Sequence, residues 1–286
     1  MLATPSYFSH RLLHELLQPP VPHITALVLA TTNRISDQSL LASPDIPVAQ
    51  PSRSGLEQTA RLAGIPIYQI RSGHDKSWLA AIDGSTNLFL VACLPLLLHS
   101  SILEHAKQSF LNLHPSLLPA FRGPDPLFWQ FRYAVNQTGM TLHRIDTEID
   151  SGAILAQHAF YPAVGIDRQA LTDKLVSTGI DMLKAWIARG CPEQELYGPF
   201  LPDSYQGWPA QKDLCISTSW SARRAYQFIC GTSDGVTQFP VRHNGKIIHK
   251  IRRAIAFDPR NQNGSNTEQQ KNTVSIHFSP GILYAC

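Results

Sequence analysis

The sequence predicts an α/β protein with a mostly parallel sheet, helices on both faces of that sheet, and a small β-rich, barrel-like part near the C-terminus. Over the first two thirds of the chain, short apolar runs alternate with segments of helical period. Such an alternation is typical of strands joined by crossover helices. Over the last third, short strand-like segments follow one another closely, as they do in small barrels.

The elements of the sheet region can be assigned in chain order. A helix is expected over 6–18, where apolar residues recur at helical spacing until a Pro-Pro pair ends the pattern. Asp167 and Gly190 are residue types that begin and end a long helix. The remaining expected strands are 23–30, 65–70, 87–93, 110–113 and 139–145, and the remaining expected helices are 54–64, 101–107 and 166–190.

Composition changes after residue 198, where a segment rich in Pro and aromatic residues indicates a linker over 199–210. We therefore expect one domain over 1–198 and a second over 211–286. In the second, a helix over 219–231 precedes strands at 237–243, 246–257, 273–278 and 281–286, and the polar segment 258–272 is expected to be an insertion loop.

Charge and composition narrow the possible classes. The chain has 286 residues, is 43% hydrophobic and only 16% charged, and can therefore bury a full core. The five cysteines show no metal spacing, which indicates reduced thiols in a cytoplasmic protein, and the longest apolar run, 88–98, is too short to span a membrane. Residues 205–286 hold 10 Lys and Arg against 4 acids, which favours a polyanionic partner such as RNA or else a solvated basic face.

The residues that indicate chemistry follow the strand at 110–113. Asn112 and His114 are two residues apart, so a strand places both on one face at its carboxyl end. An acid-rich loop ending in Asp150 follows the strand at 139–145. Asn and His can stabilise an oxyanion, and Asp can orient the His or accept a proton. A hydrolase, an acyl transferase and a structural network all remain compatible with this spacing, and His143 is expected to be packed or hydrogen-bonded.

Two motifs make the assignment more specific. The segments "NLHPSLLPAFRG" (112–123) and "DSG" (150–152) resemble the folate-dependent N-formyltransferases, whose fold is Rossmann-like, and the chain is most similar to the methionyl-tRNA branch of that family. The likeness extends over nearly the whole chain, including "VACLPLLL" and "PAQKDLCISTSWSARRAYQFICG".

The resemblance implies a mechanism and a set of site residues. The donor is 10-formyltetrahydrofolate, Asn112 and His114 bind the tetrahedral oxyanion, and Asp150 holds His114 and takes up the amine proton. It implies a monomer that needs no metal, with folate and an aminoacyl-tRNA as partners. The residues expected to frame the pterin are Cys93, Leu94, Pro95, Leu96, Asp146 and Glu148, and those expected to contact substrate are Ser116, Leu117, Leu118, Arg122, Arg223 and Arg224.

The chain departs from the family pattern in two places. Only Met1 and Leu2 stand where the family has a central strand, so we expect the native start to lie upstream. The region 31–51, where the tRNA enzymes carry a basic loop, has Arg34 as its only base. These departures keep three alternatives open: a formyltransferase acting on a small amine such as an amino-sugar nucleotide or an amino-acid-derived metabolite, a formyltetrahydrofolate hydrolase, and a non-catalytic RNA- or folate-binding relative.

Overall fold

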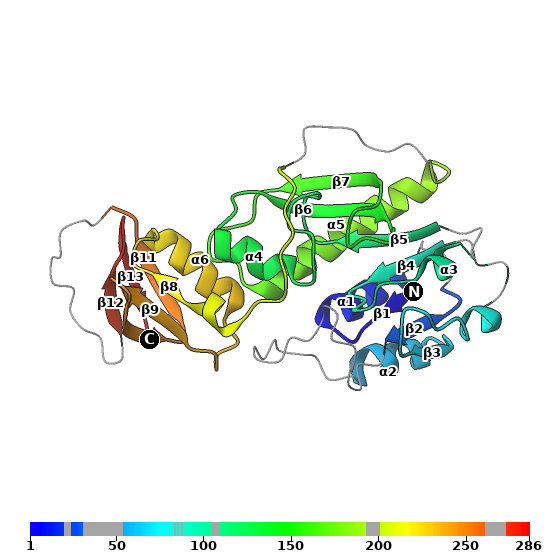
Figure 1. The fold of residues 1–286 in the computed structure, drawn as a ribbon, viewed down its shortest axis with the longest axis horizontal. Coiled ribbons are helices and arrows are strands. Elements are labelled where there is room, and N and C mark those ends of the chain that lie inside the picture. The colour runs from blue at the N-terminus through cyan, green and yellow to red at the C-terminus, as the bar shows by residue number, and fades with distance from the viewer. Residues whose placement is uncertain are drawn as a thin grey trace.

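The computed structural model describes residues 1–19, 24–30, 54–82, 84, 86, 88–104, 109–192, 201–260 and 273–286. The molecule is elongated, with a seven-stranded sheet and its helices at one end and a β-rich part, here called the C-terminal part (residues 211–286), at the other (Figure 1). Helices α4 (Pro126–Tyr133) and α6 (Ala222–Thr232) pack together between the two ends. None of the described helices is both long and apolar enough to cross a lipid bilayer.

The large sheet is mostly parallel, as expected. Its strand order is β3-β2-β1-β4-β5-β6-β7, in which only the pairs β5–β6 and β6–β7 are antiparallel. The strands are β1 (Leu2–Ala3), β2 (Leu27–Ala30), β3 (Ile67–Ile70), β4 (Leu88–Ala92), β5 (Ser109–His114), β6 (Thr138–Arg144) and β7 (Ile154–Phe160). The helices around it are α1 (Tyr7–Leu16), α2 (Ser54–Leu62), the short η1 (Leu79–Ala81), α3 (Ser100–Leu103) and α5 (Arg168–Ala188).

Helices lie on both faces of the sheet because successive strand residues point to opposite sides. On one face, side chains such as Leu29 and Leu111 pack against α1, α2 and α5. On the other face, Val28 and Val91 pack against Ile102 of the short helix α3. The helix α3 on this second face is short, and the same face carries the polar residues of β5.

The helix ends follow the capping residues in the sequence. The Asp167 side chain accepts a hydrogen bond from Ala170 N at 2.7 Å and so begins α5, and the chain leaves that helix at Gly190 with φ +79°. The Ser6 side chain accepts from Ser9 N at 3.0 Å at the start of α1. The predicted helices over 6–18 and 166–190 are therefore confirmed.

The two longest elements that were not expected from the sequence are α4 and β7. Helix α4 is buried almost all round because it lies between the sheet and the C-terminal part, so its residues show no polar stripe of helical period. Strand β7 is an edge strand with a mixed burial pattern, and it pairs with β6, the strand that runs antiparallel to both of its neighbours. The expected mostly parallel sheet is therefore confirmed, with its antiparallel pairs at this end.

The central strand, of which only Met1 and Leu2 were expected to remain, is the two-residue strand β1 (Leu2–Ala3). Leu2 and Ala3 lie between β2 and β4, pair with both in parallel register, and are fully buried. The amino group of Met1 donates a hydrogen bond to Ala26 O at 2.8 Å. The strand β1 therefore spans only part of the length of β2 and β4.

The C-terminal part is β-rich, as expected, and its described strands form two three-stranded sheets of order β10-β9-β8 and β11-β13-β12. The expected strand over 246–257 is two strands, because the chain bends at Arg252 and Arg253, whose amides both donate to Cys286 O. The elements are η2 (Gln211–Leu214), β8 (Ile216–Ser217), β9 (Phe239–His243), β10 (Lys246–Ile251), β11 (Ala254–Asp258), β12 (Val274–His277) and β13 (Ile282–Ala285).

Aromatic and guanidinium contacts fix the C-terminal part to α4. The rings of Phe128 and Phe228 meet edge to face with centroids 5.5 Å apart. The Arg224 guanidinium lies 3.9 Å from the Trp220 ring centroid, and its Nε donates to Arg132 O at 3.0 Å. The two ends of the molecule thus share one packed joint at α4 and α6.

Candidate active site

Asn112 and His114 lie on β5 and point to the same face of the sheet, as the alternation of strand residues predicts. Strand β6 pairs with β5 in antiparallel register, which places His143 opposite Asn112 and Thr141 opposite His114. A hydrogen bond of 3.1 Å joins Asn112 Nδ2 to His143 Nε2. The antiparallel pairing therefore brings a second imidazole into the site.

Asp150 belongs to the loop between β6 and β7, which folds back toward the strands. Its φ is +51°, a conformation that Asp adopts more readily than most residues. The loop closes tightly at Gly152, where a Cβ atom would lie 2.0 Å from Arg144 O. Asp150 Oδ2 accepts a hydrogen bond from Gly123 N at 2.9 Å, which anchors the carboxylate and directs Oδ1 toward the strand residues.

Three nitrogens surround Asp150 Oδ1. Asn112 Nδ2 lies 3.4 Å away, His114 Nδ1 3.5 Å and His143 Nε2 3.7 Å. These distances are long for strong hydrogen bonds, although both imidazoles are buried. Each of these contacts can therefore be exchanged for a shorter one when a ligand oxygen enters the site.

Backbone carbonyls fix the orientation of both imidazole rings. His114 Nε2 lies 3.0 Å from Phe121 O and His143 Nδ1 lies 2.7 Å from Arg144 O. Because a carbonyl oxygen only accepts, both of these nitrogens carry a hydrogen and donate it. The remaining nitrogen of each ring, His114 Nδ1 and His143 Nε2, faces Asp150.

Burial lowers the pKa of His143 to about 4, against the opposing effects of the Asp150 carboxylate and the hydrogen bond to Arg144 O. His143 is therefore neutral near pH 7, and its Nε2 accepts a hydrogen bond. This requires Asn112 to direct its NH₂ group, rather than its oxygen, toward the cluster. Asn112 consequently presents the donor hydrogens that an oxyanion hole needs.

The same side chains have the spacing of a metal site. His114 Nδ1, His143 Nε2 and Asp150 Oδ1 lie within 4.8 Å of one another, although the sequence spacing indicated no cluster of metal ligands. The Asn112 NH₂ group, however, is within hydrogen-bonding distance of two of these three atoms and would face a bound cation. The arrangement accordingly suits an anionic oxygen better than a metal ion.

The residues expected to frame a pterin lie on two loops. Val91 on β4 pairs with Asn112 on β5, so the segment that directly follows β4 leaves the sheet beside the site. That segment contains Cys93, Leu94, Pro95 and Leu96, with Cys93 exposed at φ +51°. Asp146 and Glu148 are exposed on the loop that also carries Asp150.

The residues expected to contact substrate do not form one surface. The Ser116 hydroxyl is buried and donates to Ala120 O at 2.7 Å, while the Arg122 guanidinium forms an ion pair with Asp203 through contacts of 2.9 and 3.2 Å. The structure places these predicted residues in three locations, with Ser116, Leu117 and Leu118 in the core, Arg122 against the segment 203–206, and Arg223 and Arg224 on α6.

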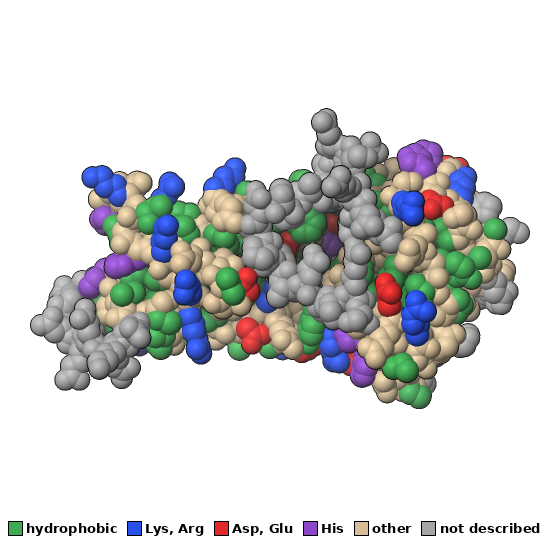
Figure 2. Space-filling view, turned by 90° about the horizontal axis from the view of Figure 1, so that it is seen from below, with side chains coloured by type: hydrophobic (Ala, Val, Ile, Leu, Met, Phe, Trp, Pro, Cys, Tyr) green, Lys and Arg blue, Asp and Glu red, His purple; other side chains and the backbone are tan. Residues whose placement is uncertain are grey.

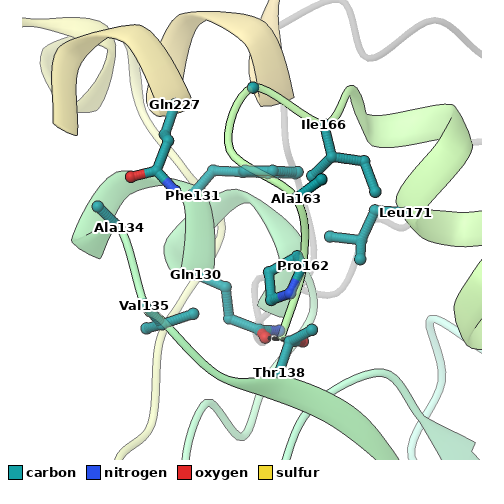
Figure 3. Close-up of a pocket in the computed structure, with 11 residues that line it drawn as sticks. Gln130, Phe131, Ala134, Val135, Thr138, Pro162, Ala163, Ile166, Leu171 and Gln227 are labelled. Carbon is teal, nitrogen blue, oxygen red and sulfur yellow. Dashed lines mark hydrogen bonds between the residues drawn. The ribbon is translucent and has the colours of Figure 1, made fainter. Parts of the chain in front are cut away.

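An indentation of about 350 Å³, open solvent included, lies between α4 and the segment 162–166 (Figure 3). Its walls are mainly apolar, and the side chains of Gln130 and Thr138 at its base bond to each other at 2.5 Å. Asn112, His114 and Asp150 are absent from its lining. It is therefore separate from the site described above.

The sequence did not single out two features of this site. His143 was expected to be packed or hydrogen-bonded, but its hydrogen bond to Asn112 depends on the antiparallel register of β5 and β6, which no local pattern reveals. The segment Asp203–Gln206 pairs with residues 121–123 beside the site. Its composition resembles an ordinary linker, so no signal in the sequence marked it.

Asn112, His114 and Asp150 meet beside the end of β5, and their donor groups and carboxylate are of the kinds that chemistry on a carbonyl carbon uses. The chain belongs to the formyl transferase family, whose family model matches residues 2–183. The enzyme class expected from the sequence, a formyltransferase, is therefore confirmed.

The chain resembles methionyl-tRNA formyltransferases in sequence and N-formyltransferases of solved structure in fold. The methionyl-tRNA formyltransferase of Clostridioides difficile (strain 630) is 28% identical over 85% of this chain and 81% of its own length, and that of Synechococcus sp. (strain JA-2-3B'a(2-13)) is 34% identical over 41% and 38%. Among solved structures, the sugar 3N-formyl transferase WlaRD, with dTDP and 5-N-formyl-THF, has a TM-score of 0.65 at 19% identity, covering 99% of this chain and 95% of its own. The N-formyltransferase of Helicobacter canadensis, with folinic acid and dTDP-3-aminofucose, has a TM-score of 0.66 at 17% identity, covering 99% and 97%. These structural likenesses establish the fold.

We expect the low pKa of His143 to make folding pH-dependent. The folded protein binds this proton more weakly than the unfolded chain, whose His has a pKa of 6.5, so stability is present above pH 6.5 and falls toward pH 4. The loss at pH 4 is roughly 3 kcal/mol. His143→Gln keeps an acceptor for Asn112 without a titrating group. Urea unfolding at several pH values should therefore show the free energy of unfolding of the wild type falling toward that of the variant as the pH falls. Parallel curves would contradict this assignment.

Proposed function

We propose that this enzyme transfers the formyl group of 10-formyltetrahydrofolate to a primary amine, with Asn112, His114 and Asp150 as its catalytic residues. The observation that carries the proposal is the set of nitrogens converging on Asp150 Oδ1, with an amide donor fixed by His143. Family membership supports formyl transfer, and the folate ligands of WlaRD and of the H. canadensis enzyme support the donor. The segments 93–96 and 146–148 are proposed to frame its pterin.

The reaction begins when the amine nitrogen attacks the formyl carbon. The carbonyl π bond breaks, and its electron pair forms the oxyanion of a tetrahedral intermediate. Asn112 Nδ2 and His114 Nδ1 exchange their long contacts to Asp150 for contacts to this oxyanion. Asp150 takes the proton from the amine, directly or through water. When the intermediate collapses, the electron pair of the oxyanion re-forms the carbonyl π bond, the bond from carbon to the folate N10 breaks, and N10 takes up the proton that Asp150 accepted.

These reaction steps leave the net charge of the site unchanged. The negative charge leaves Asp150 as the proton arrives and appears on the oxyanion, which lies among the same donors. Donors that are already oriented need little reorganisation in a poorly solvated site, and this lowers the barrier. Gly123 N remains bonded to Asp150 Oδ2 and holds the carboxyl group in place throughout.

We propose the amino group of methionyl-tRNA as the acceptor. The methionyl-tRNA formyltransferases that match this chain by sequence support it, as does the charge of the proposed second domain, 211–286. Its described Lys and Arg side chains are mostly exposed and form no ion pairs with the described acids, since Asp213, Asp234 and Asp258 instead bind nearby backbone amides. Lys and Arg side chains line this end of the molecule in Figure 2. Such a surface fits the phosphates of an RNA acceptor.

A small amine on a nucleotide, such as an amino-sugar nucleotide, is the second candidate. One observation favours it: the region 31–51, which lies outside the described residues, contains Arg34 as its only base together with two acids. A loop that reaches an RNA backbone needs more cations than this.

The test is to supply 10-formyltetrahydrofolate labelled in its formyl group, together with charged tRNA, amino-sugar nucleotides or buffer. Label in methionyl-tRNA is the expected result, and the KM for tRNA should then rise steeply with salt because phosphate contacts release counterions. Label in a sugar would select the second candidate, and formate alone would identify a hydrolase. No release of label in any mixture would overturn the proposed function.

A further inference from the structure

The backbone segment Phe121–Gly123, here called the catalytic support loop, contacts both His114 and Asp150. Phe121 O accepts the hydrogen bond from His114 Nε2 at 3.0 Å. Gly123 N donates to Asp150 Oδ2 at 2.9 Å. Any displacement of this loop therefore changes the orientation of the imidazole and of the carboxylate together.

The other side of the support loop is bound by the segment that connects the two ends of the molecule. Arg122 N donates to Ser204 O, and Gln206 N donates to Arg122 O, each at 2.9 Å. The Ser204 hydroxyl accepts from Phe121 N, also at 2.9 Å. The Asp203 carboxylate pairs with the Arg122 guanidinium, but Asp203 is 59% exposed, so this pair contributes little energy by itself.

The support loop has a backbone that must be held in place. Phe121 has φ +61°, a conformation that is rare for a bulky side chain, and Gly123 has φ +114°. Such residues cost free energy and persist only where their surroundings fix them. The Ser204 hydroxyl accepts a hydrogen bond from the amide of the strained residue Phe121, and Ser204 O accepts one from the amide of Arg122. It is therefore the side chain best placed to hold Phe121 O toward His114.

We propose that the connecting segment Asp203–Gln206 is a positioning element of the active site, in which the Ser204 hydroxyl holds Phe121 so that its carbonyl orients His114. The inference rests on the proposed function only for the expected change in kcat, and the orientation of His114 can be tested without it. It gives the segment that precedes the C-terminal part a role in the chemical step itself, in addition to any acceptor that the C-terminal part binds.

The experiment compares Ser204→Ala with wild type in the full-length chain by kinetics and by ¹⁵N NMR of histidine-labelled protein. We expect kcat to fall about tenfold at unchanged KM for folate, because a small misplacement of a catalytic group has large effects on rate. The ring ¹⁵N signals of His114, assigned with His114→Gln, should shift. Ser204→Thr, which keeps the hydroxyl, should restore both.

Ser217→Ala is the matched control, because it deletes a hydroxyl that bonds only Ser219 among the described side chains, away from the site. It should leave kcat and the His114 signals unchanged. Unmoved His114 signals in Ser204→Ala would overturn the proposal whatever the acceptor is. If no acceptor is formylated by the wild type, the proposed function fails, but the NMR comparison still decides whether Ser204 positions His114.

Discussion

Asp150→Asn should lower the rate of formyl transfer by about 10²–10⁴ with little effect on folding, because the variant removes the group that accepts the amine proton. The fold should survive because Asn also tolerates φ +51°, and its carboxamide oxygen can still accept the hydrogen bond from Gly123 N. The KM for folate should change little, since the carboxylate acts on the amine and on the developing oxyanion. Single-turnover transfer of labelled formyl groups measures this rate directly.

Asp181→Asn is the control for this experiment. Asp181 is an exposed acid on α5, and α5 packs against the face of the sheet opposite to the one that carries Asn112 and His114. Neutralising it changes the net charge by the same amount and should leave the rate unaltered. Equal losses in the two variants would indicate a general electrostatic effect, and an unaltered rate in Asp150→Asn would restrict Asp150 to holding the loop.

Gly123→Ala should both destabilise the protein and inactivate it. A Cβ atom at this position would lie 2.1 Å from Gln206 O, so the support loop and the connecting segment would have to separate. A side chain at φ +114° adds conformational strain of roughly 1–3 kcal/mol. The separation would also withdraw Gly123 N from Asp150 Oδ2. We expect a lower urea midpoint and a large loss of transfer rate per folded molecule.

Gly190→Ala separates these two causes. Gly190 has φ +79°, but a Cβ atom there would meet nothing within 4 Å, so only the conformational strain is added. This control should lose stability and keep its transfer rate. A Gly123→Ala protein that retains full activity when folded would show that the contact between Gly123 and Asp150 is not needed for catalysis.

Much of the site was predictable because its residues are close in sequence. Asn112 and His114 share a strand face through the two-residue period alone, and the motifs 112–123 and 150–152 indicated a formyltransferase, which the family match confirms. The pattern of apolar runs likewise predicted the mostly parallel sheet, because buried strands and amphipathic helices each impose a period on the residues that they bury. The catalytic roles of these residues and the acceptor remain predictions.

The sequence by itself determined most of the elements, though not α4 or β7, together with the sheet class and the pair Asn112–His114, because those follow from local periods and caps. Only the tertiary structure decided the partners of that pair. The antiparallel register of β5 and β6 placed His143 beside Asn112, and burial then fixed it as a neutral acceptor. The folding of 203–206 onto 121–123 likewise joins residues some eighty positions apart. Contacts of this kind depend on which strands and loops become neighbours, and local periodicity carries no information about that.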